Sequence, residues 1–327
     1  MSAADPSGRP RREPVELLGL PPLRAVLRLA VPTTLVMVLA TATNVLYTFF
    51  VSRLGAEAIA AVSLVFPISL LASTAMTGGL GGGAASGIAR ALGAGHREHA
   101  VDVAEHAVAL AAIIGVVLAV LMALGGPALF ALMGGTGEVR AAAVTFARVV
   151  FGGALITFVS AMLDSTLRGE GNVRVPAIWS SVSLGLQIVL TPLCMFWGGL
   201  GLVGAAVALV VSQAIALVPR ARFVYGGGGL LHPRMWPRRL RAAPLREILR
   251  VGVPASLSTI INYLGLMVLT SVVARLGTAH LAAYGLCTRF DFLLMSFAYG
   301  FAAAVLTLVG LTTGARRPDR ARLYVTR

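Results

Sequence analysis

The chain has 327 residues, of which 57% are hydrophobic and only 12% are charged, about half the charged fraction of an ordinary soluble domain. With a mean hydropathy of +0.86, it lacks the polar side chains needed to cover a water-soluble surface, so a bilayer is the expected environment. All 27 basic side chains are arginines, which excludes a lysine-containing phosphate-binding loop and a lysine Schiff base.

Charge and cysteine content narrow the function classes further. The net charge of +14 is compatible with nucleic-acid binding, but the arginines lie where membrane topology requires them, so we expect no nucleic-acid partner. Cys194 and Cys287 each lie in an apolar run and lack the spacing of a disulfide framework or a zinc site. We expect neither a metal nor an organic cofactor.

Residues 1–28 are rich in proline and arginine. They do not have the pattern of a cleaved secretory signal and are predicted to form a cytoplasmic N-terminal tail. Eight apolar runs follow, each long enough to cross the hydrocarbon core, and lipid tolerates no open sheet edge, so an all-α polytopic membrane protein is predicted. Pro67 and Pro192 inside the runs predict kinks. The predicted spans are 29–51, 59–89, 104–125, 140–164, 175–197, 200–224, 250–273 and 282–312.

Arginine placement predicts the orientation. With a cytoplasmic N-terminus, 22 of the 27 arginines fall in cytoplasmic segments, which is a strong positive-inside bias. We expect a multi-pass protein of a bacterial cytoplasmic (inner) membrane, surrounded by lipid, with both chain ends inside. The basic segment 226–249 is predicted to be an inter-lobe linker that touches anionic lipid, and its Gly226–Gly229 run is typical of a flexible connection.

An internal repeat organises the chain. A shift of 222 positions superposes Val31-Pro32 on Val253-Pro254 and Arg53-Leu54-Gly55 on Arg275-Leu276-Gly277. Six predicted spans separate the two copies, so both copies have the same orientation, as in the parallel repeats of two-lobed transporters. We predict an N-terminal six-helix lobe at 29–225, the linker at 226–249, and the first two helices of a second lobe at 250–327.

The second copy contains two predicted helices where the first contains six. We therefore expect the chain to be a C-terminally truncated form of a twelve-helix protein, and a non-functional remnant is one alternative for its activity.

Several short motifs together resemble the multidrug and toxic compound extrusion (MATE) family. The resemblance covers about residues 25–325 and implies a secondary antiporter that expels amphipathic, often cationic, compounds in exchange for H⁺ or Na⁺, with two six-helix lobes around a central cavity. The motifs are Val31-Pro32, Phe50–Gly55 with Ala60-Ala61-Val62, Gly93-Ala94-Gly95, Arg168–Asn172, and the repeat of the first stretch at 253–286.

The chain departs from this family at the cation site of the first lobe. Where relatives of the DinF branch carry an aspartate on the first helix, this chain has Tyr47, and where they carry asparagine and aspartate on the fifth helix it has Gln187 and Thr191. A threonine of their sixth helix aligns with Leu209. These side chains can hydrogen-bond, but they do not exchange a proton near neutral pH.

Asp291 lies about ten residues into the last predicted span. A carboxylate at that depth costs a few kcal/mol on insertion scales, so it is a candidate for binding a proton or a cationic substrate in the central cavity. The structural alternative is an ion pair with Arg289 or Arg148. Arg289 is only two residues away, so it lies on a different helix face.

The remaining polar residues of the spans have both functional and structural explanations. Asp164 precedes Arg168 by four residues, which favours an ordinary ion pair at a helix end. Interhelical hydrogen bonding and cavity lining are equally compatible with the positions of Asn44, Tyr47, Gln187, Gln213 and Asn262.

Two further clusters have structural interpretations. The run Gly78–Gly83 is embedded in a span, where glycine indicates close helix packing rather than phosphate binding. His96, His99 and His106 lie among three acidic residues, but at a cytoplasmic turn, where charged residues are expected beside lipid headgroups, so a metal site is disfavoured.

The sequence thus favours a monomeric drug or cation antiporter that is not an enzyme. A lipid-linked oligosaccharide flippase is the alternative within transport. It ranks second because its anionic substrate calls for several intramembrane arginines, and only Arg148 and Arg289 qualify. A membrane-embedded enzyme ranks lower still, because the sequence offers no nucleophile–base pairing at membrane depth.

Overall fold

The computed structural model describes residues 22–275, except 235, 238 and 239, together with scattered positions between 294 and 312. Its helices are α2 (Pro22–Ser52), α3 (Ala56–Thr74), η1 (Ala75–Leu80), α4 (Gly81–Gly93), α5 (Arg97–Leu132), α6 (Gly137–Gly152), α7 (Ala154–Gly169), α8 (Arg174–Pro192), η2 (Leu193–Trp197), α9 (Gly201–Tyr225) and α10 (Ala242–Arg275). The elements η1 and η2 are π-helical turns. No strand occurs in the described part of the chain.

The predicted all-helical architecture is confirmed for the described residues. Five described segments are long and apolar enough to cross a membrane, and α6 with α7 adds a sixth if the pair, bent by 42°, forms one span. The 34-residue helix α10 covers the seventh predicted span. The eighth, at 282–312, falls almost entirely outside the described residues, so the predicted count of eight is consistent with the structure.

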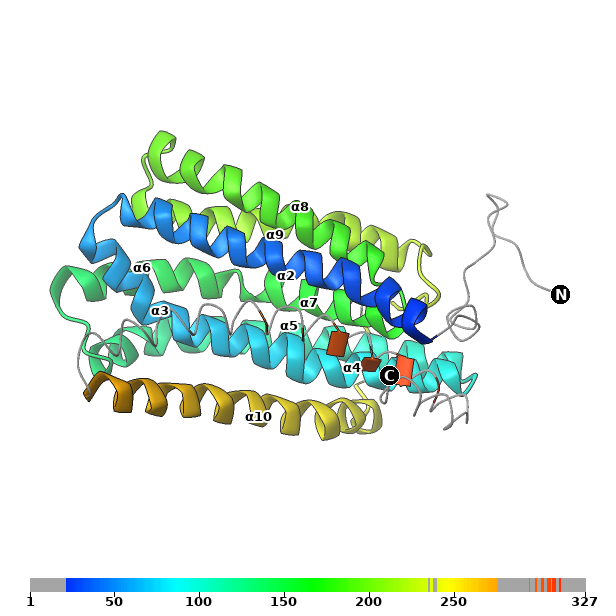
Figure 1. Ribbon diagram of the computed structural model, residues 1–327. Helices are drawn as coiled ribbons and strands as arrows, with labels where there is room; N and C mark the ends of the chain where they lie inside the picture. Colours follow the sequence, from blue (N-terminus) through cyan, green and yellow to red (C-terminus); the bar gives the residue numbers. More distant parts are fainter. Residues whose placement is uncertain are drawn as a thin grey trace.

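The helices form one elongated bundle, in which α2, α8 and α9 lie on one side and α10 on the opposite side, along α4 and α5 (Figure 1). Tight turns connect several of the helices. Gly55, Gly95 and Gly171 each have a positive φ in the turns between α2 and α3, α4 and α5, and α7 and α8, a conformation that residues with a side chain adopt reluctantly.

Irregular helix geometry occurs at two places. Pro192 ends α8, and the π-helical turn η2 follows directly, as expected where proline removes a backbone donor. By contrast, α3 continues through Pro67. Its irregular turn is η1, in the glycine-rich segment where α10 packs.

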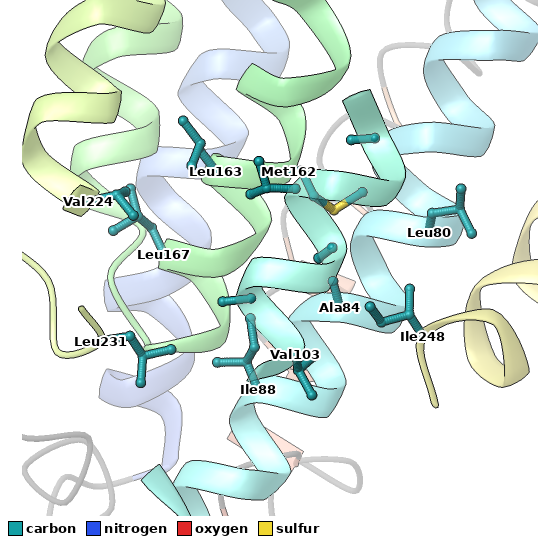
Figure 2. Close-up of a cluster of buried hydrophobic side chains, with 14 of the residues drawn as sticks. Leu80, Ala84, Ile88, Val103, Met162, Leu163, Leu167, Val224, Leu231 and Ile248 are labelled. Atoms are coloured by element: carbon teal, nitrogen blue, oxygen red, sulfur yellow. The ribbon is translucent and has the colours of Figure 1, made fainter. Parts of the chain in front are cut away.

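The main core cluster joins helices of the first lobe to the linker and to the start of α10. Figure 2 shows Leu80, Ile88, Met162 and Leu167 packed together, with Leu231 of the linker and Ile248 of α10 at the edge of the same cluster. Leu231 and Ile248 are both fully buried. The start of the second lobe is therefore anchored in the apolar core of the first, a contribution of about 2 kcal/mol for each such side chain.

Candidate functional site: polar clusters of the first lobe and its seam with α10

Tyr47 is the predicted site residue with the most distinctive environment. It lies in the second half of α2 and packs against the core cluster around Val51 and Phe146. Its hydroxyl is buried and has no hydrogen-bond partner among the described residues. A buried hydroxyl without a hydrogen-bond partner costs about 1–3 kcal/mol.

The other predicted polar residues differ in exposure. Thr191 is buried and donates its hydroxyl to the Gln187 carbonyl oxygen at 2.6 Å, within its own helix. Gln187 itself is half-buried, whereas Asn44 and Asn262 are exposed. Helices α2 and α8 pack side by side, so the structure brings the helix that carries Tyr47 next to the one that carries Gln187. Asp291 and Arg289 lie outside the described residues.

Asp164 takes part in a buried ionic cluster between three helices. Its Oδ1 lies 3.1 Å from Arg220 Nε on α9, and its Oδ2 accepts the Ser180 hydroxyl of α8 at 3.3 Å. Arg220 also donates from Nη2 to Ser180 Oγ at 2.9 Å. Arg220 is 2% exposed. Three helices are thereby joined through charges that are shielded from solvent.

This cluster contains a partner of Asp164 that the sequence did not predict. Arg168, four residues along the same helix, donates to Ser165 Oγ at 3.2 Å, while the close ion pair is with Arg220. Sequence reasoning assigned Arg220 to the cytoplasmic arginines and so missed it. The available signal was its place inside an apolar run, where an ionisable residue usually has a buried partner.

A glycine ridge on η1 and α4, formed by Gly79, Gly83 and Gly87, makes the seam with α10. A Cβ at Gly83 would lie 2.5 Å from the Ile248 carbonyl oxygen, and one at Gly87 would lie 3.3 Å from Glu247 Oε1. A Cβ at Gly79 would collide with Ser256. These glycines recur every four residues, so they share one helix face and let two helix backbones approach closely. The predicted packing role of the glycine run is confirmed.

Polar contacts extend the seam in both directions. Ser256 donates to the Ala75 carbonyl oxygen at 3.2 Å, at the first residue of the π-helical turn. At the other end, Glu247 Oε1 forms an ion pair with Arg90 at 3.0 Å, and Glu247 Oε2 lies within hydrogen-bond distance of His99 Nε2, at 2.9 Å. Burial raises the pKa of Glu247, but the hydrogen bonds from Arg90 and His99 outweigh it, so the pKa lies below its ordinary value.

The linker after α9 is docked on the first lobe, contrary to the flexible connection predicted from its glycines. Gly227 makes a turn with a φ of 81°. The next residues are held by side chains of the lobe: Glu170 Oε2 accepts the Leu230 N–H at 2.8 Å and Oε1 the Leu231 N–H at 3.2 Å. Further along, Glu105 Oε1 accepts the Arg234 N–H at 2.8 Å.

The histidines of the cytoplasmic turn also serve this docking. His106 Nε2 accepts the Arg241 N–H at 2.9 Å while its Nδ1 lies 2.7 Å from the Asp102 carbonyl oxygen. This pattern requires the neutral ring with its proton on Nδ1. His99 belongs to the Glu247 cluster. No group of three or more metal-ligating side chains that could hold an ion occurs among the described residues.

Comparison with known families decides how this architecture is classified. A family model described as MatE matches residues 32–193 and 254–327. The two segments begin at Pro32 and Pro254, the same 222-residue offset that relates the repeats in the sequence. This chain belongs to the MatE family. The predicted MATE resemblance is confirmed, and with it a multi-pass membrane protein of the transporter class.

Curated relatives carry several names. The chain is 26% identical over 310 residues to the "FAD transporter" of Shewanella oneidensis, covering 94% of this chain and 68% of the relative. It is 28% identical over 243 residues to the "Probable multidrug resistance protein NorM" of Thermotoga maritima, covering 71% and 51%. With the "Multidrug export protein MepA" of Staphylococcus aureus it shares 24% identity over 271 residues, covering 82% and 60%. The chain therefore spans about half to two thirds of these MatE relatives.

Solved MATE structures share the fold. The crystal structure of MATE in complex with MaD3S superposes with a TM-score of 0.90 at 32% identity, covering 95% of this chain and 70% of that one. A MOP superfamily transporter from Pyrococcus furiosus superposes with a TM-score of 0.87 at 32% identity, covering 95% of this chain and 69% of that one. The description of that structure reports a reversed polarity of its binding pocket.

Proposed function

We propose that this chain contributes to a secondary active efflux antiporter that exports amphipathic or cationic compounds in exchange for H⁺ or Na⁺. The observation that carries the proposal is the paired MatE match at one fixed offset, combined with the direct packing of α10 on the first lobe. In such parallel repeats a solute passage forms between the lobes, and an ion gradient rather than ATP drives transport.

The polar groups of the first lobe set the chemistry of the proposed passage. Tyr47 supplies an aromatic ring and Gln187 a half-buried amide, while Thr191 is buried and bonded within its own helix; none of them is a carboxylate at the positions where DinF-type relatives carry one. Aromatic faces attract organic cations, while proton or Na⁺ coupling needs an ionisable or multi-oxygen site. We propose Asp291 of the second lobe as that coupling group, with no cofactor beyond the transported ion.

Location and assembly belong to the same proposal. We place the protein in a bacterial cytoplasmic membrane as a monomer, with a cytoplasmic N-terminus, on the arginine asymmetry of the sequence. Its partners are membrane lipids and small amphipathic or cationic solutes.

A cellular efflux measurement tests the proposed drug export. The full chain is expressed in a bacterium that lacks its own drug pumps, membrane insertion is verified, and ethidium accumulation is followed. We expect lower ethidium accumulation than in cells with an empty vector. We also expect this difference to disappear when the proton or Na⁺ gradient is collapsed. Unchanged accumulation with verified insertion would contradict drug export.

One observation favours a second substrate class, flavin dinucleotides. The relative named "FAD transporter" aligns with 94% of this chain, and the neutral residues Tyr47, Gln187 and Thr191 would not repel an anionic solute. The same cells therefore serve as a second assay. Accumulation of FAD in the medium, with ethidium accumulation unchanged, would support the dinucleotide substrate over the cationic one.

A further inference from the structure

A pocket lies between the docked linker and the start of α5. Its volume is about 540 Å³, which is within the range of small-molecule sites in proteins. Asp102 and Glu105 of α5 line it together with His232, Arg234 and Arg241 of the linker. The helix thus contributes two carboxylates to the pocket, and the linker contributes two guanidinium groups and an imidazole.

Some of these charged groups are already paired and others are not. Arg241 Nη1 lies 3.2 Å from Asp102 Oδ2. Glu105 Oε1 accepts the Arg234 N–H at 2.8 Å, whereas its Oε2 forms no hydrogen bond or ion pair with any residue that the structure describes. The Arg234 guanidinium has no such partner among the described residues either. One carboxylate oxygen and one guanidinium group are therefore available to a ligand.

Glu105 is the more informative of these two groups. An exposed arginine such as Arg234 can be satisfied by water, but Glu105 is only 8% exposed. Buried polar groups are nearly always hydrogen-bonded, because loss of hydration without a compensating bond is costly. The free oxygen of Glu105 thus calls for a donor inside the pocket, and an ammonium group supplies such a donor.

The balance of charges selects the class of ligand. A simple anion would be repelled by the carboxylates of Asp102 and Glu105, and a simple organic cation by the guanidinium groups of Arg234 and Arg241. A small group that carries both an ammonium and a phosphate avoids both penalties. Its phosphate suits the planar fork of an arginine, and its ammonium suits a carboxylate.

The position of the pocket favours a membrane lipid as the source of this group. Helix α5 has 36 residues, of which about 20 are needed to cross the hydrocarbon core, and its predicted span begins at residue 104. The first turns of α5 are therefore expected at the level of the lipid headgroups. Trp236, in the linker beside the pocket residues, is 51% exposed, as is typical of tryptophan at a membrane–water interface.

We propose that this pocket binds the headgroup of an aminophospholipid such as phosphatidylethanolamine. Glu105 Oε2 accepts a hydrogen bond from the primary ammonium, and the Arg234 guanidinium binds the phosphate. The lipid contacts α5 and the linker together, so it holds the connection between the lobes against the first lobe. This inference goes beyond the proposed transport function, because the lipid is a bound component and not a transported solute.

Lipid retention by the purified full chain tests the proposal. The chain is mixed in detergent with equal amounts of phosphatidylethanolamine, phosphatidylcholine and phosphatidylglycerol that carry identical acyl chains, and bound lipid is counted by native mass spectrometry. Phosphatidylcholine has the same charges but no ammonium N–H, and phosphatidylglycerol has no ammonium. We expect phosphatidylethanolamine to bind about tenfold more tightly than either, as for one charge-assisted hydrogen bond. Equal retention of all three would overturn the proposal.

Substitution of Glu105 provides a second arm. Glu105→Gln can still accept the Arg234 N–H but no longer attracts an ammonium, so the preference over phosphatidylcholine should disappear. Glu98→Gln, at an exposed position of the same helix, should retain the native preference. A native preference in Glu105→Gln would refute the assignment of the ammonium to Glu105.

An arginine variant covers the case in which Glu105→Gln fails to fold. Arg234 is exposed, and Arg234→Gln keeps its backbone N–H, so we expect a folded chain that retains phosphatidylethanolamine severalfold more weakly. Arg222→Gln, at an exposed position of α9, should retain it as the native chain does. Equal retention in these two variants would contradict the phosphate contact.

A competition experiment distinguishes the lipid from a soluble aminophosphate. Free glycerophosphoethanolamine carries the same headgroup without acyl chains, and at a concentration equal to that of the lipid we expect it to leave bound phosphatidylethanolamine in place. Displacement of the lipid would overturn its assignment as the ligand and would assign the pocket to soluble aminophosphates. None of these readouts measures transport, so a failed efflux assay and a failed lipid site are separate results.

Discussion

At the residue scale, the first lobe contains two buried and oppositely charged side chains, each of which would destabilise the fold without the other. Asp164 and Arg220 are both buried, and Ser180 hydrogen-bonds to each of them. Such a pair need not stabilise a protein relative to an apolar pair, but removal of one partner strands the other charge. The pair thus fixes the positions of α7, α8 and α9 relative to one another.

Removal of Arg220 should destabilise the lobe strongly. We expect Arg220→Ala to lower the free energy of unfolding by about 3–5 kcal/mol, measured by denaturant titration in mixed micelles. Arg222→Ala, at an exposed position of the same helix, should change it by less than about 0.5 kcal/mol. The double variant Asp164→Asn with Arg220→Met should recover much of the loss. If Arg220→Ala and Arg222→Ala lowered the free energy of unfolding by similar amounts, the buried ion pair would be contradicted.

The Glu247 contacts should be weaker and pH-dependent. The Arg90 and Glu247 side chains are about one third exposed, so solvent screens them and we expect a coupling of roughly 0.5–1 kcal/mol in a double-mutant cycle with Arg90→Ala and Glu247→Ala. Because the pKa of folded Glu247 lies below its ordinary value of 4.5, the coupling should be complete above pH 4.5 and lost as the pH falls through the lowered value. A coupling that grows on acidification would contradict this assignment.

At the element scale, the seam between η1–α4 and α10 depends on glycine at specific positions. Gly82 and Gly83 are neighbours in the sequence, but only Gly83 faces α10, where an added Cβ would lie 2.5 Å from a backbone oxygen. Nothing lies within 4 Å of the corresponding atom at Gly82. The chain therefore supplies its own matched pair of sites for testing close helix packing.

Alanine at these two sites should have opposite effects. Gly83→Ala should destabilise the chain by about 1–3 kcal/mol, because the helices must separate or shift. Gly82→Ala should be neutral or stabilising by up to about 1 kcal/mol, since alanine is the better helix former. Unfolding midpoints of the two purified variants check this, and equal midpoints would argue against the seam.

Most of the helices, but few of their polar partners, could be predicted from the sequence. Apolar runs predicted all of the described spans, because hydrophobic length is a local property of the chain. The Asp164–Arg220 pair was missed because its members are far apart in sequence and the contact depends on how α7 packs on α9. The contacts of the linker were also missed. Its glycines predicted a flexible connection, and the side chains that hold it, Glu170 and Glu105, come from distant segments of the chain.

At the scale of the whole molecule, the described part of the chain is a bundle of apolar helices with α10 packed along η1, α4 and α5. The MatE matches begin at Pro32 in α2 and at Pro254 in α10, which agrees with the internal repeat predicted from the sequence. Inter-lobe contact involves mainly η1, α4 and α5 rather than α3. The later part of α10 leaves Leu257, Ile261 and Leu269 at least half exposed, on a surface available to lipid, substrate or further helices.

Transport by the reconstituted full chain tests the account most directly. The chain is incorporated into proteoliposomes, a proton or Na⁺ gradient is imposed, and movement of ethidium and of FAD is followed against protein-free vesicles. The account predicts gradient-dependent movement of one of these solutes that is abolished when the gradient is dissipated. Movement of neither solute under either gradient, by a chain whose folding and insertion have been verified, would contradict it.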